Sequence, residues 1–255
     1  MLWVMRFTPT LVLFWCATLL AGRPNIVLIM CDDMGWADLG CYGSKQNPTP
    51  NIDQLRKEGV RFNNFLATQA VCTSSRVALL TGCYPNRLGL GGTALGPNSK
   101  IGLSNDEQTL GTLLQQAGYH TGVVGKWHLE TDPTGFDHWD VLVGQGDYWN
   151  PTFVVDGVKT VREGHVTDVI HREAITRLDQ LAEGAKAGRP FALLVHHKAP
   201  HRNWMPALRH LDLYDNIVMP EPDTLFDNWS DNSSAAANQE LEIDGHMHIN
   251  FDLFV

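Results

Sequence analysis

Cysteine, positive charge and long apolar runs are all scarce in this sequence, and each shortage excludes a class of protein. Only 5 cysteines occur among 255 residues, too few for a small disulfide scaffold. Lysine and arginine number 19 against 28 aspartates and glutamates, a formal net charge of -9, so we expect no nucleic-acid partner. The apolar run at residues 11–20 is too short to span a bilayer, so we expect no stable membrane insertion.

That apolar run lies near the N-terminus, after Arg6 and before the small residues Ala21 and Gly22. This order is typical of a secretory signal peptide, although a buried first strand or an uncleaved anchor would also fit. We therefore expect residues 1–22 to be a signal peptide and the protein to be exported, to the periplasm or the extracellular space.

Buried-strand patterns alternate with helical patterns along the rest of the chain. Strands covered on both faces are predicted at residues 25–30, 120–125 and 191–195. Helices are predicted at residues 51–58, 75–80, 107–117 and 167–185. We expect Ser104 and Glu107 to form a capping box for the third helix. The alternation predicts an α/β fold, with a mostly parallel central sheet flanked by helices.

Polar clusters follow the three predicted strands, where ligands gather in such folds. Asp32-Asp33 follows the first strand; adjacent carboxylates suit Ca²⁺ or Mg²⁺, although most such pairs are solvated turn residues. Lys126 and His128 come directly after residue 125 of the second strand. We expect the strand to continue through them, so that their side chains, two residues apart, point to the same side. The third cluster is the run HHKAPH at residues 196–201.

The most specific pattern is the run CTSSRVALLTG, from Cys72 to Gly82. Cys72 is expected at the start of a helix, where free backbone N–H groups favour an anion. Arg76, four residues later, can return along the same helix face. An isolated pair of this kind is usually a buried cysteine beside a surface arginine. The whole string C-x-S-x-R-x4-T-G, however, resembles the maturation signature of type I sulfatases.

This resemblance, which runs from Asn25 to the end of the chain, implies the alkaline-phosphatase-like sulfatase fold. It also implies that a formylglycine-generating or an anaerobic sulfatase-maturing enzyme oxidises Cys72 to formylglycine. The aldehyde hydrate has two hydroxyls, so one can attack sulfur and the other can later expel sulfate.

The resemblance further implies a role for each polar cluster. Asp32, Asp33 and the modified Cys72 would bind the metal, Ca²⁺ or Mg²⁺. Arg76 would belong to the catalytic set, and Lys126 would contact the sulfate. Two histidines complete that set: His128 as a base on the hydrate, and His201 as the group that protonates the leaving oxygen.

Residues 133–153 and 197–206 resemble carbohydrate sulfatases that act on glucosamine 6-sulfate, which implies a sulfated carbohydrate as substrate. His197 and Trp204 would then touch the sugar, and the aromatics at 139, 148 and 149 would stack on it or pack in the core. Thr167-Asp168 is expected to cap a helix and brace it by hydrogen bonds, with His165 standing where the family usually has tyrosine.

Full-length members of the family are much longer and carry a later Asp-Asn or Asp-His metal pair and a second sulfate-binding lysine. Asp231-Asn232 does not fit that pair, because no buried strand precedes it. We therefore expect residues 23–255 to be the N-terminal portion of a catalytic domain, incomplete at its C-terminus and poorly active alone. Two alternatives stay open: a phosphatase or phosphonate hydrolase of the same superfamily, and a non-catalytic glycan-binding remnant.

Overall fold

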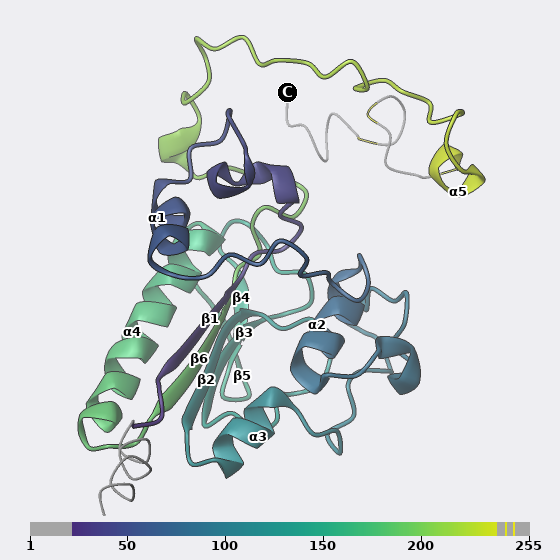
Figure 1. The fold of residues 1–255 in the computed structure, drawn as a ribbon. Coiled ribbons are helices and arrows are strands. Elements are labelled where there is room, and N and C mark those ends of the chain that lie inside the picture. The colour runs from purple at the N-terminus through teal and green to yellow at the C-terminus, as the bar shows by residue number, and fades with distance from the viewer. Residues whose placement is uncertain (1–21, 239–242, 244–246, 248–255) are drawn as a thin grey trace, which may run out of the picture.

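Residues 22–238, 243 and 247 are described by the computed structural model of the chain (Figure 1). The signal peptide predicted at residues 1–22 therefore lies outside the described residues except for Gly22. Among the described residues, no helix combines the length and the apolar character needed to cross a bilayer.

A six-stranded sheet forms the centre of the molecule, in the spatial order β1-β6-β2-β3-β4-β5. The first four strands in that order run parallel, and β4 and β5 are added antiparallel. The bounds are β1 Ile26–Met30, β2 His120–Lys126, β3 His138–Leu142, β4 Thr152–Val155, β5 Val158–Val161 and β6 Phe191–His196. The prediction of a mostly parallel α/β sheet is thus confirmed, whereas β3, β4 and β5 had not been predicted.

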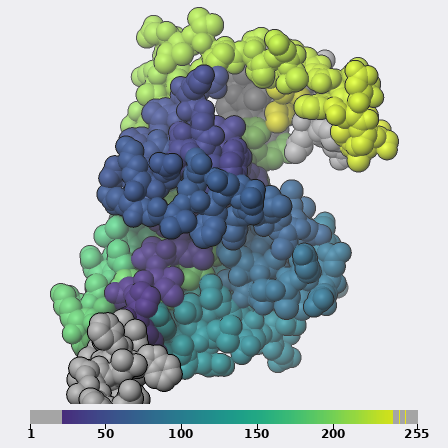
Figure 2. All heavy atoms as spheres, viewed as in Figure 1, coloured from purple at the N-terminus to yellow at the C-terminus, as the bar shows by residue number. Residues whose placement is uncertain are grey.

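Helix α4 covers one face of this sheet, and α2 and α3 lie on the other (Figure 1). The helix bounds are α1 Pro50–Glu58, α2 Cys72–Thr81, α3 Leu110–Gln116, α4 Val166–Lys186 and α5 Ser234–Ala237. Successive residues of β2 and β6 point to opposite faces: Val124 and Leu193 pack with α4 in one apolar cluster. On the other face Val123 and Leu194 pack with α2 in a second cluster. In Figure 2 the blue segment that includes α1 sits above this body, with the yellow-green C-terminal segment beyond it.

Two helix caps differ from the prediction. The α3 helix is capped by Thr109, whose hydroxyl accepts from the Thr112 backbone N–H at 3.1 Å, and not by Ser104 and Glu107. Residues 104–107 form a turn instead, closed by the Glu107 N–H on the Ser104 carbonyl at 3.1 Å. The α4 helix is capped by the His165 ring, which accepts from the Thr167 N–H at 3.3 Å, so Thr167-Asp168 is not the cap. A ring nitrogen one residue outside the helix reaches the free N–H groups that Thr167 itself cannot satisfy.

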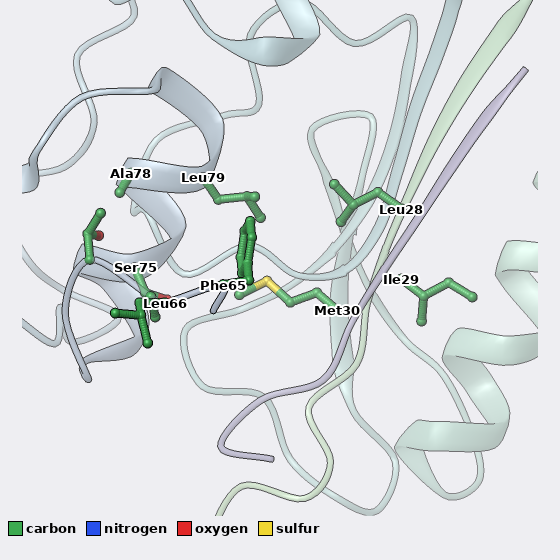
Figure 3. A pocket seen from close by; sticks show the side chains of 10 residues that line it. Leu28, Ile29, Met30, Phe65, Leu66, Ser75, Ala78 and Leu79 are labelled. Atoms are coloured by element: carbon green, nitrogen blue, oxygen red, sulfur yellow. The ribbon is translucent and has the colours of Figure 1, made fainter. Parts of the chain in front are cut away.

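The strand β1 is less covered than the sequence predicts. Its apolar run predicts burial on both faces, but β1 is an edge strand and Val27 and Ile29 are 48% and 64% exposed. An apolar hollow of about 400 Å³ lies on the α2 side of β1. Figure 3 shows Leu28 and Met30 pointing into it, with Ile29 on the opposite side of the strand. The expected burial on both faces is therefore wrong for β1, whereas it is confirmed for β2 and β6.

Candidate active site

The carboxyl ends of three parallel strands meet at one edge of the sheet. Met30 of β1 lies beside His196 of β6, which also lies beside Gly125 of β2. The segments that follow are joined as well, since the Asp32 N–H donates to the Ala199 carbonyl at 3.2 Å. The polar clusters predicted at three separate places in the sequence are therefore neighbours in space.

Gly125 allows β2 and β6 to come together at this edge. Its φ of 103° belongs to the left-handed region that glycine tolerates, and a Cβ built there would lie 2.0 Å from the His196 carbonyl oxygen. Glycine is therefore required immediately before Lys126.

A buried group of three charges forms the centre of the site. Asp32, Arg76 and Lys126 are at most 3% exposed. The Arg76 Nη2 donates to Asp32 Oδ1 at 3.2 Å, and the Lys126 ammonium donates to Asp32 Oδ2. Arg76 also donates to the Lys126 carbonyl. Two cations thus face one carboxylate, and the excess positive charge is suited to an anionic ligand.

The pKa values in this group follow from burial and from the neighbouring charges. Burial would raise the pKa of Asp32, but the charges of Arg76 and Lys126 outweigh burial, so this pKa lies below its usual value. Burial lowers the pKa of Lys126, and the charge of Asp32 partly opposes that change. The carboxylate is therefore ionised at neutral pH.

Cys72 lies at the start of α2, as expected, although this helix begins at residue 72 and not at the predicted residue 75. It also lies close enough to Lys126 to act on the pKa of that lysine. The Gln145 side-chain amide nitrogen is 3.9 Å from its sulfur, and the Gln145 side-chain oxygen accepts from the Lys126 ammonium. One glutamine side chain therefore links Cys72 to Lys126, and through it to Asp32. The Arg76 guanidinium joins the site through Asp32 and the end of β2.

His128 lies beyond the end of β2 rather than on it. The strand ends at Lys126, and His128 has a φ of 56°, so the expectation of two side chains on the same strand face is wrong. Its Nε2 is 2.5 Å from the Leu95 carbonyl, which can only accept, so Nε2 carries the proton. Its buried Nδ1 has no hydrogen-bond partner among the described residues. Burial lowers the pKa of His128 to about 4, which leaves Nδ1 free to accept a proton.

His201 and Asp33 form the more open side of the site. The His201 Nε2 is 3.7 Å from Asp33 Oδ2, and the Asp33 side chain is 58% exposed. Burial lowers the pKa of His201, and the charges of Lys126 and Lys198 lower it further. His201 is therefore neutral at pH 7 in this arrangement, and the charge of an arriving anion would raise its pKa.

The residues expected to touch a sugar lie at different depths. Trp204 and Trp149 are 43% and 36% exposed, while Tyr148 is buried. His197 is half-buried, and burial lowers its pKa, as does the charge of His171 of α4. Trp149 and Trp204 therefore offer open ring surface.

Two residues of this region escaped the sequence analysis, Gln145 and Lys198. Gln145 lies between two glycines in a turn after β3, a strand that had not been predicted. Lys198 lies among the histidines of residues 196–201, and nothing in that run distinguishes it as a site residue. Its side chain is 4% exposed, and a buried lysine is the signal that only the structure provides.

The described residues offer the type of ligand that a hard divalent cation prefers, but too few of them for a complete site. Asp32 and Asp33 offer carboxylate oxygens, the donors that Ca²⁺ and Mg²⁺ prefer. Both Asp32 oxygens are engaged by Arg76 and Lys126. Among residues 22–238, 243 and 247, no three His, Cys, Asp or Glu side chains form a metal-binding group. These residues thus supply part of a ligand set.

A family model described as Sulfatase matches residues 24–233. The chain belongs to the sulfatase family. This sulfatase chain is 42% identical over 234 residues to the N-acetylglucosamine-6-O-sulfatase of Bacteroides thetaiotaomicron, covering 91% of this chain and 40% of that protein. It is 50% identical over 115 residues to human arylsulfatase A, covering 45% of this chain and 23% of that protein.

A solved structure supports the same assignment. This is the structure of the protein BT4656 in complex with its substrate, D-glucosamine-2-N,6-O-disulfate. It matches this sulfatase chain with a TM-score of 0.82 and 41% identity, over 91% of this chain and 45% of BT4656. The expected alkaline-phosphatase-like sulfatase fold is thereby confirmed. The chain spans less than half the length of these relatives, which are sulfuric ester hydrolases.

Proposed function

We propose that this chain takes part in hydrolysing sulfate esters of glycans, through a formylglycine made from Cys72. The observation that carries the proposal is the buried charge group of Asp32, Arg76 and Lys126 beside the first residue of α2. An excess of buried positive charge next to a helix N-terminus is suited to a sulfate group.

The chain's own side chains would divide the work. Lys126 and Arg76 would hold the negative sulfate oxygens and balance the charge that develops there. His128, neutral and with a free Nδ1, would accept a proton from the nucleophile. His201 would give a proton to the leaving oxygen, after the bound sulfate has raised its pKa.

Two groups would be added to these side chains. A formylglycine hydrate at position 72 would supply a nucleophilic hydroxyl and a second hydroxyl that allows sulfate to leave. Asp32 and Asp33, with residue 72, would hold Ca²⁺ or Mg²⁺, which polarises the sulfate oxygens. Among the described residues, these carboxylates supply only part of a ligand set.

The proposed substrate is a sulfated sugar of the glucosamine 6-sulfate type. Relatives with that activity or ligand match 91% of the chain. Trp149 and Trp204 offer partly exposed rings on which a sugar can stack. Export, with residues 1–22 as a signal peptide and 23–255 as the catalytic portion, belongs to the same proposal.

The direct test is mass spectrometry of the Cys72 peptide after co-expression with a formylglycine-generating enzyme. We expect that peptide to lose its sulfur and gain an aldehyde, and the peptide of the likewise half-buried Cys83 to remain a thiol. An intact Cys72 thiol, or equal oxidation of both cysteines, would refute the proposed maturation.

Turnover provides a second test. We expect the matured chain alone to be poorly active, to favour a sulfate ester over the matched phosphate ester in the turnover that it does show, and to lose that turnover in Cys72→Ala. A preference for phosphate would favour the phosphatase alternative.

A further inference from the structure

Lys198 is a buried cation that the proposed mechanism does not use. It is 4% exposed, although lysine seldom lies in the interior without a partner. Its ammonium donates to the Gln145 backbone carbonyl at 3.3 Å and lies 4.9 Å from the centre of the Tyr148 ring. Both partners belong to the turn between β3 and β4, so these contacts of Lys198 stabilise the turn.

The turn that Lys198 holds has little rigidity of its own. Gly144 and Gly146 flank Gln145 with φ values of 55° and 71°, and the Gly146 N–H closes the turn on the Val143 carbonyl at 3.0 Å. Glycine on both sides gives the backbone wide freedom. A contact to the Gln145 carbonyl therefore helps to fix the Gln145 side chain, which enters the site.

The Gln145 side chain bridges two groups of the site. Its oxygen accepts from the Lys126 ammonium, and its nitrogen faces the Cys72 sulfur at 3.9 Å. The other partner of Lys198, Tyr148, donates its hydroxyl to the His201 carbonyl. Lys198 is thus joined to both sides of the site through a single turn.

We propose that Lys198 is a positioning residue that holds the Gln145 amide between the Cys72 sulfur and the Lys126 ammonium. It acts through the Gln145 carbonyl and the Tyr148 ring, not by touching the substrate. The placement of Gln145 follows from the geometry alone; only its catalytic consequence rests on the proposed function.

The test is the NMR signal of the Gln145 side-chain amide, identified by its loss in Gln145→Ala. In the parent we expect an ordered amide with a shift distinct from that of free glutamine. In Lys198→Met it should move to the free-glutamine position. The Gln115 amide, bound to Asp137 at 2.8 Å, serves as an internal reference and should not move. The exposed Lys186→Met variant should leave both signals unchanged.

A second variant covers the case in which Lys198→Met does not fold. Lys198→Gln keeps a hydrogen-bond donor but has shorter reach, so it should shift the Gln145 signal in the same direction and by less. An unchanged Gln145 signal in a folded Lys198 variant would overturn the proposal, as would equal shifts at Gln145 and Gln115.

Kinetics of matured and active enzyme add a separate readout. Misplacing the Gln145 amide beside residue 72 should lower kcat by about 10- to 100-fold while KM changes little. Because the NMR signature needs no turnover, it remains informative even if the proposed sulfatase activity fails.

Discussion

Replacing Asp32 with asparagine tests whether the buried charge group stabilises the fold or strains it. The substitution keeps the shape of the side chain and leaves the Asp32 backbone contact to Ala199 in place. It removes the only negative charge that Arg76 and Lys126 contact at a distance below 4 Å among the described residues. Both cations have fully buried side chains, so solvent cannot replace the lost partner.

The expected cost follows from that burial. Removing one partner of a buried ion pair costs about 3–5 kcal/mol, because a charge is left uncompensated in the interior. Asp168 and Arg209 form the matched control, since they make the same kind of contact in a bidentate form at 2.6 and 2.8 Å. Their side chains are 44% and 55% exposed, so Asp168→Asn should cost far less.

Urea unfolding at pH 7 measures both variants on the same scale. We expect the midpoint of Asp32→Asn to fall well below that of Asp168→Asn, with similar slopes. If Asp32→Asn equals or exceeds the parent in stability, the cost of burying the Asp32 carboxylate outweighs its ion pairs. The account of the charge group given above would then be wrong.

Three further predictions concern the buried His196, the glycine at position 125 and the helix cap His165. Burial takes the pKa of His196 from 6.5 to about 3, so only the unfolded chain binds this proton as pH falls below 6.5. His196 should therefore contribute about 1.4 kcal/mol per pH unit to the fall in the free energy of unfolding until pH 3 is approached, in addition to the contribution of His128. His196→Asn should reduce the slope by that amount, and exposed His210→Asn should leave it unchanged. Gly125→Ala should cost at least about 2 kcal/mol, whereas Gly188→Ala, also at positive φ but with open space around it, should cost about 1 kcal/mol in thermal unfolding. His165→Ala should cost about 1 kcal/mol by removing the α4 cap, and His165→Asn should restore part of it; an unchanged melting temperature in His165→Ala would contradict the assigned cap.

The sequence predicts the elements whose apolar pattern is strong. The long stripe of α4 and the buried runs of β2 and β6 were found within a few residues, because their burial on the sheet dictates the pattern. The strands β3 to β5 are short and only partly buried, so no period of two residues stands out. The cap of α3 was misplaced because Ser104 and Glu107 have the right spacing, while Thr109 and Thr112 lie closer to the apolar residues that pack.

The candidate site was predictable where one short motif holds its residues, and less so where distant segments meet. Cys72 and Arg76 share a helix, and Asp32 ends a strand, so local spacing identifies them. Gln145 and Lys198 come from two turns 53 residues apart, and nothing in either turn indicates the other. His128 was placed on a strand because its positive φ leaves no trace in the sequence.

The depth of the helix that begins at Cys72 has a consequence for the order of events in biosynthesis. Thr73, Ser74 and Arg76 have no exposed surface once the chain has folded. Under the proposed maturation, an enzyme that recognises those side chains could not reach them in the folded chain. Oxidation of Cys72 would then have to precede folding, and a thiol that escaped it would stay reduced.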